Sequence, residues 1–411
     1  MPEIVLIRHA ESAANVSRSW QGRGDAEVSV EGRTQIKALT GRLARRRFDA
    51  VVSSPLSRAV ETAAGLADAP DVDEDLIEID LGVWEDVSIE DVLRDHGALL
   101  RSIYGGGDDR FGLSGERLSE VATRAWTAID QIAEQVGPAG SAAIVTHGGV
   151  IDAVLATLLP SVTRRPHRMV SNTALSHLVG VPGRWRLARF NDSAHLGKMS
   201  PYAREHLDSG GRLLALIRHG RTRANVEGRA QGQSCWGLDE VGHAQAGRMV
   251  DWYGRLDTVF TSPLSRAVST AAAIAAGAPV TVDGLKEIAM GEWEGLDFAE
   301  IRLRWPDETR AIFDEGQDLP RGISGETWQG VTDRAVATIG GLDFPGSQVS
   351  GVVTHGGLIR AYVGTLGGGT AAATLHTPDN TSVTHIALTD HGPVLCDYAV
   401  APHLEEMAVA P

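Results

Sequence analysis

Near its start the sequence reads Ile4-Val5-Leu6-Ile7-Arg8-His9, and past its midpoint it reads Leu213-Leu214-Ala215-Leu216-Ile217-Arg218-His219. A short apolar run of this kind predicts a buried strand. In an open α/β sheet, ligands bind beyond the carboxyl ends of the strands, and each Arg-His pair falls at such an end. The two stretches therefore predict two ligand sites, each beginning at a histidine.

The rest of the chain repeats in the same way, at an offset of 208 to 210 residues (219 − 9 = 210; 355 − 147 = 208). The segment Ser54–Val60 recurs at Ser262–Val268, and Val145–Gly149 recurs at Val353–Gly357. Each copy has the length of an ordinary single domain. We therefore predict a tandem duplication, with a first domain at 1–196, a linker at 197–211 and a second domain at 212–411.

Within each copy, expected strands alternate with expected helices, which predicts a parallel sheet covered on both faces. In the first copy, residues 50–52 form a β-branched run, and Ser54-Pro55 then reads as a helix N-cap followed by proline. Residues 148–159 are expected to form a helix, and 177–190 a hairpin that closes the sheet. The fold class is α/β: two tandem three-layer α/β/α domains, each with a mostly parallel sheet and helices on both faces.

Composition excludes several function classes. The chain has 411 residues, of which 43% are hydrophobic and 22% charged, with a formal net charge of −15. This acidity argues against a nucleic-acid binder, and no apolar run is long enough to cross a bilayer. The one basic run, 42–47, falls at the end of an expected helix, where the helix dipole favours it. Two cysteines and no visible signal peptide predict a cytoplasmic protein.

The expected strand ends bring together residues suited to a phosphoryl group. Arg8 and His9 end one strand, Arg58 begins the helix after the next, and His147 ends a third. Guanidinium groups bind phosphate through paired hydrogen bonds, and the helices expected near Ser54 and Gly148 add backbone donors. The chain shows neither a metal-ligand pattern nor a Gly-Lys-Ser/Thr phosphate loop. The sequence therefore predicts phosphate chemistry without a metal or another cofactor.

Four motifs, present in order in both copies, resemble those of the histidine phosphatase superfamily, the phosphoglycerate-mutase-like group. They are Arg-His-Ala-Glu-Ser-Ala-Ala-Asn at 8–15 (Arg-His-Gly-Arg-Thr-Arg-Ala-Asn at 218–225), Ser-Pro-Leu-Ser-Arg-Ala, Leu-x-Glu before Gly-x-Trp-Glu, and Thr-His-Gly-Gly. The resemblance implies covalent catalysis through phosphohistidine on His9 and His219. It implies that Glu78 and Glu287 protonate the leaving oxygen and then activate water. The groups it implies for binding phosphate are Arg8, Asn15, Arg58 and His147, and Arg218, Asn225, Arg266 and His355.

The acid is open to alternatives, because two other glutamate pairs recur: Glu85 with Glu294, and Glu116 with Glu326. A solvated carboxylate beside Trp84 accounts for Glu85, and a helix start accounts for Glu116. The family pattern favours Glu78 and Glu287.

The copies differ in one loop. Gln21-Gly22-Arg23-Gly24-Asp25 becomes Gln231-Gly232-Gln233-Ser234-Cys235, so the second copy lacks an arginine and a carboxylate near the expected pocket. We predict a metal-independent phosphatase that acts on a small phosphorylated metabolite. A phosphoglycerate-type mutase is one alternative, and one catalytic domain beside a regulatory, phospholigand-binding domain is another. The sequence leaves the substrate and the oligomeric state open.

Overall fold

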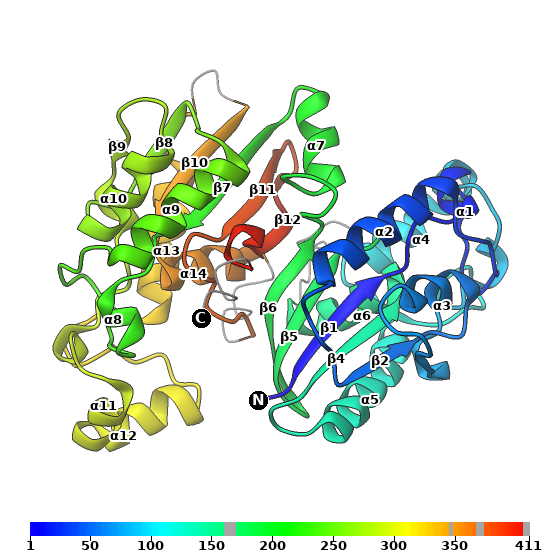
Figure 1. The fold of residues 1–411 in the computed structure, drawn as a ribbon, viewed down its shortest axis with the longest axis horizontal. Coiled ribbons are helices and arrows are strands. Elements are labelled where there is room, and N and C mark those ends of the chain that lie inside the picture. The colour runs from blue at the N-terminus through cyan, green and yellow to red at the C-terminus, as the bar shows by residue number, and fades with distance from the viewer. Residues whose placement is uncertain (160–169, 345–347, 367–373, 406–411) are drawn as a thin grey trace. The chain divides into compact units, whose positions relative to one another are not determined.

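The structure is a computed structural model that describes residues 1–159, 170–344, 348–366 and 374–405 (Figure 1). It divides into two compact units. The first unit comprises Met1–Arg204 with Leu366–His376, and the second comprises Glu205–Thr365 with Thr377–Pro411. Helix α7 (Pro201–Asp208) lies inside the segment predicted to be a linker.

The first unit contains a mixed sheet in the order β3-β2-β4-β1-β5-β6. Neighbouring strands from β3 to β1 pair in parallel, whereas β5 and β6 form an antiparallel hairpin beside β1. The strands are β1 (Glu3–Arg8), β2 (Ala50–Ser53), β3 (Asp71–Val72), β4 (Ser141–Thr146), β5 (Leu175–Val181) and β6 (Arg184–Asp192). The turn of the hairpin falls at Pro182-Gly183, inside the predicted 177–190 segment.

Helices cover both faces of this sheet because successive side chains of a strand point to opposite faces. Val5 and Ile7 of β1 pack with residues of α2 and α3, whereas α5 and α6 contact β1 as well. The helices of this unit are α1 (Ala13–Val16), α2 (Val30–Leu43), α3 (Ser57–Ala64), α4 (Ile89–Tyr104), α5 (Leu118–Val136) and α6 (Gly148–Leu158). Short 3-10 turns at Glu74–Leu76 and Gly82–Trp84 lie between β3 and α4.

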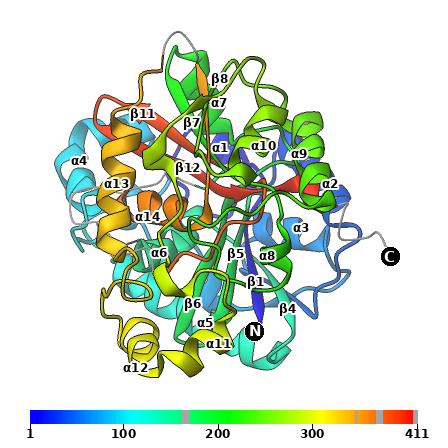
Figure 2. The ribbon, with the colours of Figure 1, turned by 90° about the vertical axis from the view of Figure 1, so that its left-hand side faces the viewer.

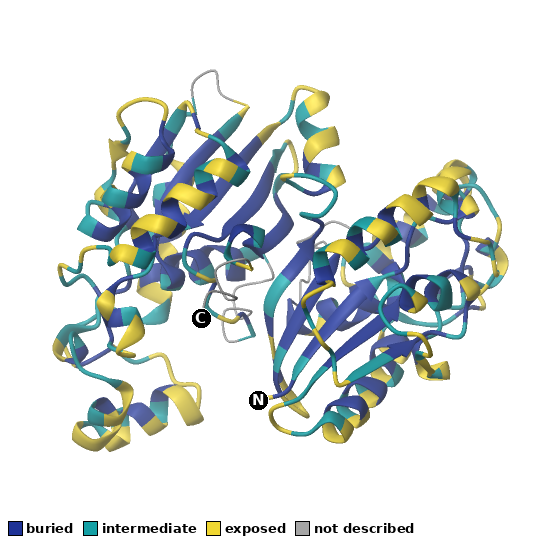
Figure 3. Ribbon diagram, viewed as in Figure 1, coloured by how far each residue is buried: buried dark blue, intermediate teal, exposed yellow. Residues whose placement is uncertain are grey.

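The second unit repeats this architecture, with the sheet order β12-β11-β7-β10-β8-β9. Its strands are β7 (Arg212–Arg218), β8 (Thr258–Thr261), β9 (Val280–Thr281), β10 (Val349–Thr354), β11 (Val383–Thr389) and β12 (Gly392–Val400). Its helices are α8 (Arg223–Val226), α9 (Glu240–Tyr253), α10 (Ser265–Ile274), α11 (Phe298–Arg304), α12 (Pro306–Thr309), α13 (Trp328–Gly340) and α14 (Gly356–Leu366). Helices α9 and α10 lie side by side (Figure 2). In both units the strands are mostly buried, and the outer faces of the helices are exposed (Figure 3).

The predicted fold class is confirmed: each half is an α/β domain whose sheet is mostly parallel. Of the described helices, none is both long enough and apolar enough to span a membrane.

One local prediction is wrong. Ser54 does not cap a helix, because Leu56 still has extended backbone angles and α3 begins only at Ser57. The carboxylate of Asp25 accepts the N–H of Ser57 instead, at 2.8 Å. The basic run at 42–47 begins in the last turn of α2, as predicted, and Arg42 also forms a buried ion pair with Asp192 at 2.7 Å.

Candidate active site

The two histidines of the first domain meet because their strands are parallel neighbours. Arg8, the last residue of β1, pairs in register with Thr146, the last residue of β4, so His9 and His147 leave the sheet together. Their ring centroids are 5.1 Å apart. In the second domain His219 and His355 follow β7 and β10, and their centroids are also 5.1 Å apart. All four side chains are buried.

The hydrogen bond on Nδ1 decides which nitrogen of the predicted nucleophile is available. Nδ1 of His9 lies 2.7 Å from the carbonyl oxygen of Ala10, and Nδ1 of His219 lies 2.7 Å from that of Gly220. A carbonyl oxygen can only accept, so each neutral ring carries its proton on Nδ1. The lone pair of Nε2 is therefore the nucleophilic position in both rings.

Both rings stay neutral at physiological pH. Burial first, and then the charges of Arg8 and Arg58, lower the pKa of His9 well below its ordinary value of 6.5. Burial together with Arg218 and Arg266 does the same to the pKa of His219. Burial is therefore the larger cause of this neutrality, and the neighbouring arginines add to it.

We expect His9 and His219 to keep the Nδ1–H tautomer from about pH 7.5 down to about pH 5.5, a range in which an exposed imidazole of pKa ~6.5 takes up a proton. Because their pKa is lowered, protonation begins only at more acid pH. Long-range ¹H–¹⁵N spectra of the imidazoles check this, with the signals assigned through the His9→Gln and His219→Gln variants. An Nε2 signal that titrates near pH 6.5 in either ring contradicts the assignment.

The two arginines of the first site each keep one buried donor that no described residue binds. Arg58, the second residue of α3, donates from Nη1 to Gly24 O at 2.6 Å and from Nη2 to Gly22 O at 2.9 Å. Arg8 donates from Nη1 to Val170 O at 2.6 Å. In the part of the chain that the structure describes, Nε of both arginines is buried and unpartnered. Burial, which outweighs Glu78 and Asp25, lowers the pKa of Arg58 to about 10.

His147 contributes a third buried nitrogen of this kind. Its Nε2 lies 2.6 Å from Oγ of Ser54, and its Nδ1 has no partner among the described residues. The second domain repeats the set: Ser262 Oγ lies 2.8 Å from His355 Nε2, while Nδ1 of His355 and Nε of Arg218 and Arg266 have no partner among the described residues. Buried polar atoms in native proteins almost always find a partner, so each set fits a bound oxyanion.

The side chains of the predicted acids reach the N-terminus of a helix: α6, which follows His147, in the first domain, and α14, which follows His355, in the second. The carboxylate of Glu78 accepts the N–H of Ile79 at 2.9 Å and that of Gly149 at 3.3 Å. Glu287 accepts from Ile288 at 2.9 Å, from Gly357 at 3.0 Å and from Leu358 at 3.2 Å. A Cβ at Gly149 or Gly357 would overlap this carboxylate, which explains the second of the two glycines after each Thr-His.

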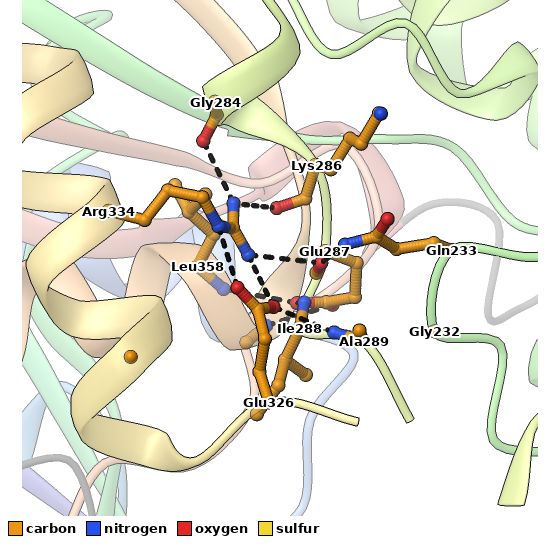
Figure 4. Close-up of polar contacts among 12 residues, drawn as sticks. Gly232, Gln233, Gly284, Lys286, Glu287, Ile288, Ala289, Glu326, Arg334 and Leu358 are labelled. Atoms are coloured by element: carbon orange, nitrogen blue, oxygen red, sulfur yellow. Dashed lines mark hydrogen bonds and ion pairs between the residues drawn. The ribbon is translucent and has the colours of Figure 1, made fainter. Parts of the chain in front are cut away.

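In each domain an arginine binds both a second glutamate and the main-chain carbonyl oxygen of the predicted acid. Arg334 bridges Glu326 and three carbonyl oxygens, including that of Glu287 (Figure 4). In the first domain Arg124 binds Glu116 at 3.0 Å and the carbonyl oxygen of Glu78 at 3.3 Å. Burial raises the pKa of Glu116, but Arg124 and the N–H of Asp80 bring it below its ordinary value. Glu116 is therefore held ionised as a support, which argues against it as an acid.

The other alternative, Glu85, holds the variable loop and is not simply solvated. Its carboxylate accepts the N–H of Arg23 at 3.1 Å, and Glu294 accepts that of Gln233 at 2.8 Å. Arg23 also contacts the carbonyl oxygen of Glu78 at 3.3 Å, and Gln233 that of Glu287 at 3.1 Å. The difference between the copies therefore lies next to the predicted acid.

The remaining predicted residues, Asn15 and Asn225, lie in short helices beside the nucleophiles. Their Oδ1 atoms accept the N–H of Ser12 and of Thr222, each at 3.1 Å. Asn172 donates to Oδ1 of Asn15 at 3.3 Å and to the carbonyl oxygen of His9 at 2.9 Å. Two side chains, Asn172 and Arg124, and the contact of Ser54 with His147 were not predicted from the sequence, although all three residues recur in the second copy.

The sequence model of the histidine phosphatase superfamily (branch 1) matches residues 4–193 and 214–400. The chain belongs to this superfamily. Two stretches match, so the superfamily domain occurs twice in tandem.

Several superfamily members of known or assigned activity are similar to parts of the chain. A metal-independent phosphoserine phosphatase of Arabidopsis thaliana is 31% identical over 203 residues, 47% of this chain and 84% of the relative. A probable phosphoglycerate mutase of Yersinia enterocolitica is 28% identical over 207 residues, 48% and 95% of the two chains. Phosphoserine phosphatase 1 of Hydrogenobacter thermophilus is 39% identical over 97 residues, 23% of this chain and only 46% of that relative. A solved mycobacterial glucosyl-3-phosphoglycerate phosphatase is 31% identical, with a TM-score of 0.41, and the match covers 45% and 96% of the two chains.

Proposed function

We propose that this protein is a phosphoric monoester hydrolase that works through phosphohistidine, without a metal, at both His9 and His219. One observation carries the proposal. In each domain a neutral imidazole, with its proton fixed on Nδ1, lies beside three buried nitrogens that lack a partner among the described residues, two of them arginine Nε donors. Neutral imidazole is the form that attacks phosphorus, and donors of this kind neutralise phosphoryl oxygens in the transition state.

The reaction then proceeds in two displacements. Nε2 of His9 forms a bond to phosphorus while the ester P–O bond breaks, and the leaving oxygen takes a proton from Glu78. In the second step Glu78 takes a proton from water, the hydroxide attacks phosphorus, and the P–N bond breaks to release inorganic phosphate and His9. Arg8, Arg58 and His147 hold the phosphoryl oxygens throughout, with Asn15 beside them. Glu287 and His219 perform the same steps in the second domain.

The substrate class is a small phosphorylated metabolite, as is typical of the superfamily. The similar plant protein is named a phosphoserine phosphatase, which makes O-phosphoserine a suitable first member of a substrate panel. The two sites need not share a substrate, because Arg23 and Asp25 beside the first are Gln233 and Cys235 beside the second.

Release of inorganic phosphate from such a panel by the full chain, in the presence of a metal chelator, tests this function. We expect turnover of at least one phosphomonoester, with no loss when chelator is added. The mutase alternative is favoured by the similarity to a probable phosphoglycerate mutase. It predicts isomerised phosphoglycerate in place of free phosphate when a bisphosphorylated primer is supplied. Isomerisation without hydrolysis, or a strict metal requirement, would overturn the proposal.

A further inference from the structure

Two side chains hold the peptide bond that follows the nucleophile, one on each side. The carbonyl oxygen of His9 accepts from Nδ2 of Asn172 at 2.9 Å, and the N–H of Ala10 donates to Oγ1 of Thr62 at 3.0 Å. In the second domain the carbonyl oxygen of His219 accepts from Asn380 at 2.8 Å, and the N–H of Gly220 donates to Thr270 at 2.9 Å. A peptide group is planar and rigid, so two such bonds fix its orientation. We call these pairs, Thr62 with Asn172 and Thr270 with Asn380, the clamps.

Each clamp is connected to the imidazole through one further bond. The carbonyl oxygen that accepts Nδ1–H of His9 belongs to Ala10, the residue whose N–H is held by Thr62. Rotation of the His9–Ala10 peptide would displace that carbonyl and turn the ring. The direction of Nε2 therefore depends on the clamp.

The threonine of each clamp is itself fixed. Thr62 is fully buried, and its hydroxyl donates to the carbonyl oxygen of Arg58 at 2.7 Å. Because its proton is used there, its lone pair is what receives the N–H of Ala10. The hydroxyl of Thr270 likewise donates to the carbonyl oxygen of Arg266 at 2.8 Å. The clamp thus connects the nucleophile to the helix turn that carries the phosphate-binding arginine.

The asparagine of each clamp is held by a strained residue. Thr173 has φ 57° and Thr381 has φ 59°, a left-handed conformation that β-branched residues adopt at a cost. Oγ1 of Thr173 donates to the carbonyl oxygen of Asn172 at 2.7 Å and therefore accepts from Nε2 of His195 at 2.9 Å. Thr381 makes the same contacts with Asn380 and His403. Both domains maintain this strain directly beside the asparagine.

We propose that Thr62 and Asn172, and Thr270 and Asn380, are positioning residues that aim Nε2 of the nucleophilic histidine at phosphorus. This inference rests on the proposed function. The clamps touch no reacting atom, and they act in the step in which the N–P bond forms as the ester P–O bond breaks. Other residues bind the phosphoryl oxygens, so a loosened clamp slows histidine phosphorylation and leaves oxyanion affinity in place.

The test uses the full chain carrying His219→Ala, so that only the first site reports, with p-nitrophenyl phosphate as substrate. We expect Thr62→Val, which removes the hydroxyl at equal size, to lower the pre-steady-state rate of nitrophenolate release roughly 10- to 100-fold, the scale of a small misalignment of reacting groups. The inhibition constant for inorganic phosphate should change less than about twofold, on the same argument. Thr62→Ser should recover the burst rate, and Asn172→Leu, which loses the donor without adding a charge, should reproduce the loss.

The control is Thr123→Val, because Thr123 makes the same bond to the carbonyl four residues earlier in its helix but lies outside the site. An unchanged burst rate in both Thr62→Val and Asn172→Leu overturns the inference. So does a parallel loss of phosphate affinity, which indicates a general collapse of the pocket. If Thr62→Val does not fold, judged by thermal unfolding, Asn172→Leu decides alone. Absence of any turnover with both clamps intact refutes the proposed function instead.

Discussion

Replacing both His9 and His219 by alanine is expected to lower phosphate release by roughly 10⁴-fold or more, since removal of a catalytic nucleophile costs up to about 10⁶-fold in other covalent enzymes. The reason is that no other described imidazole offers an Nε2 lone pair beside the unpartnered arginine nitrogens. Inorganic phosphate should still bind to the double variant, because Arg8, Arg58 and His147 and their counterparts remain. Phosphate release from the panel substrate measures the first effect, and calorimetric titration of the double variant with inorganic phosphate measures the second.

The single variants divide the activity between the domains. If both sites turn over, His9→Ala and His219→Ala each remove part of the activity, and the parts differ between substrates if Arg23 and Gln233 select different ones. The exposed His243 provides a control, since His243→Ala should change nothing. Loss of all activity in one single variant and none in the other contradicts two working sites and supports a binding role for one domain. Full activity in the double variant refutes phosphohistidine altogether.

The sequence predicted the positions that depend on strand ends. An apolar run followed by Arg-His places His9 at the end of a strand whichever register the sheet adopts, and a second apolar run places His147 at the end of another strand in the same way. The parallel register of Arg8 with Thr146 then brings the two rings together, as the prediction required. The α/β architecture followed from the same alternation of strands and helices.

Contacts that depend on distant loops could not be predicted in this way. Asn172 lies 163 residues from His9 in the sequence, and no local sequence pattern predicts that a side chain will bind a distant main-chain carbonyl. Ser54 before a proline has the local signature of an N-cap, yet its hydroxyl contacts His147, and it is Asp25 that accepts the N–H of Ser57 at the start of α3. The recurrence of Asn172 as Asn380 was the available signal, although recurrence alone does not separate function from common descent.

The role of Glu78 should appear as a dependence on the leaving group. We expect Glu78→Gln, in the chain carrying His219→Ala, to lower turnover of an alkyl phosphate such as O-phosphoserine roughly 10²- to 10⁴-fold, the usual contribution of a positioned general acid. Glutamate uses Oε1 for the N–H of Ile79 and Oε2 for that of Gly149, so the glutamine keeps one of these two bonds, and it has no proton of suitable acidity to give. An alkoxide leaves poorly without a proton, whereas p-nitrophenolate leaves readily. The burst of nitrophenolate should therefore fall far less than the release of serine.

The competing carboxylates make this comparison decisive. Glu116→Gln weakens the ion pair with Arg124, and Glu85→Gln weakens the hold on the Arg23 loop, so both variants should lower the turnover of alkyl and aryl phosphates by similar factors. Only replacement of the residue that gives the proton should lower the turnover of alkyl phosphates much more than that of aryl phosphates. If Glu85→Gln or Glu116→Gln shows the selective loss and Glu78→Gln does not, the acid is misassigned, although the phosphohistidine step would stand. Glu287→Gln in the chain carrying His9→Ala extends the same argument to the second domain, where the carboxylate accepts a third N–H, that of Leu358. If Glu287→Gln also lowers the turnover of alkyl phosphates selectively, proton transfer is the same in both domains. The sequence change in the loop at 231–235 would then affect only which substrate binds.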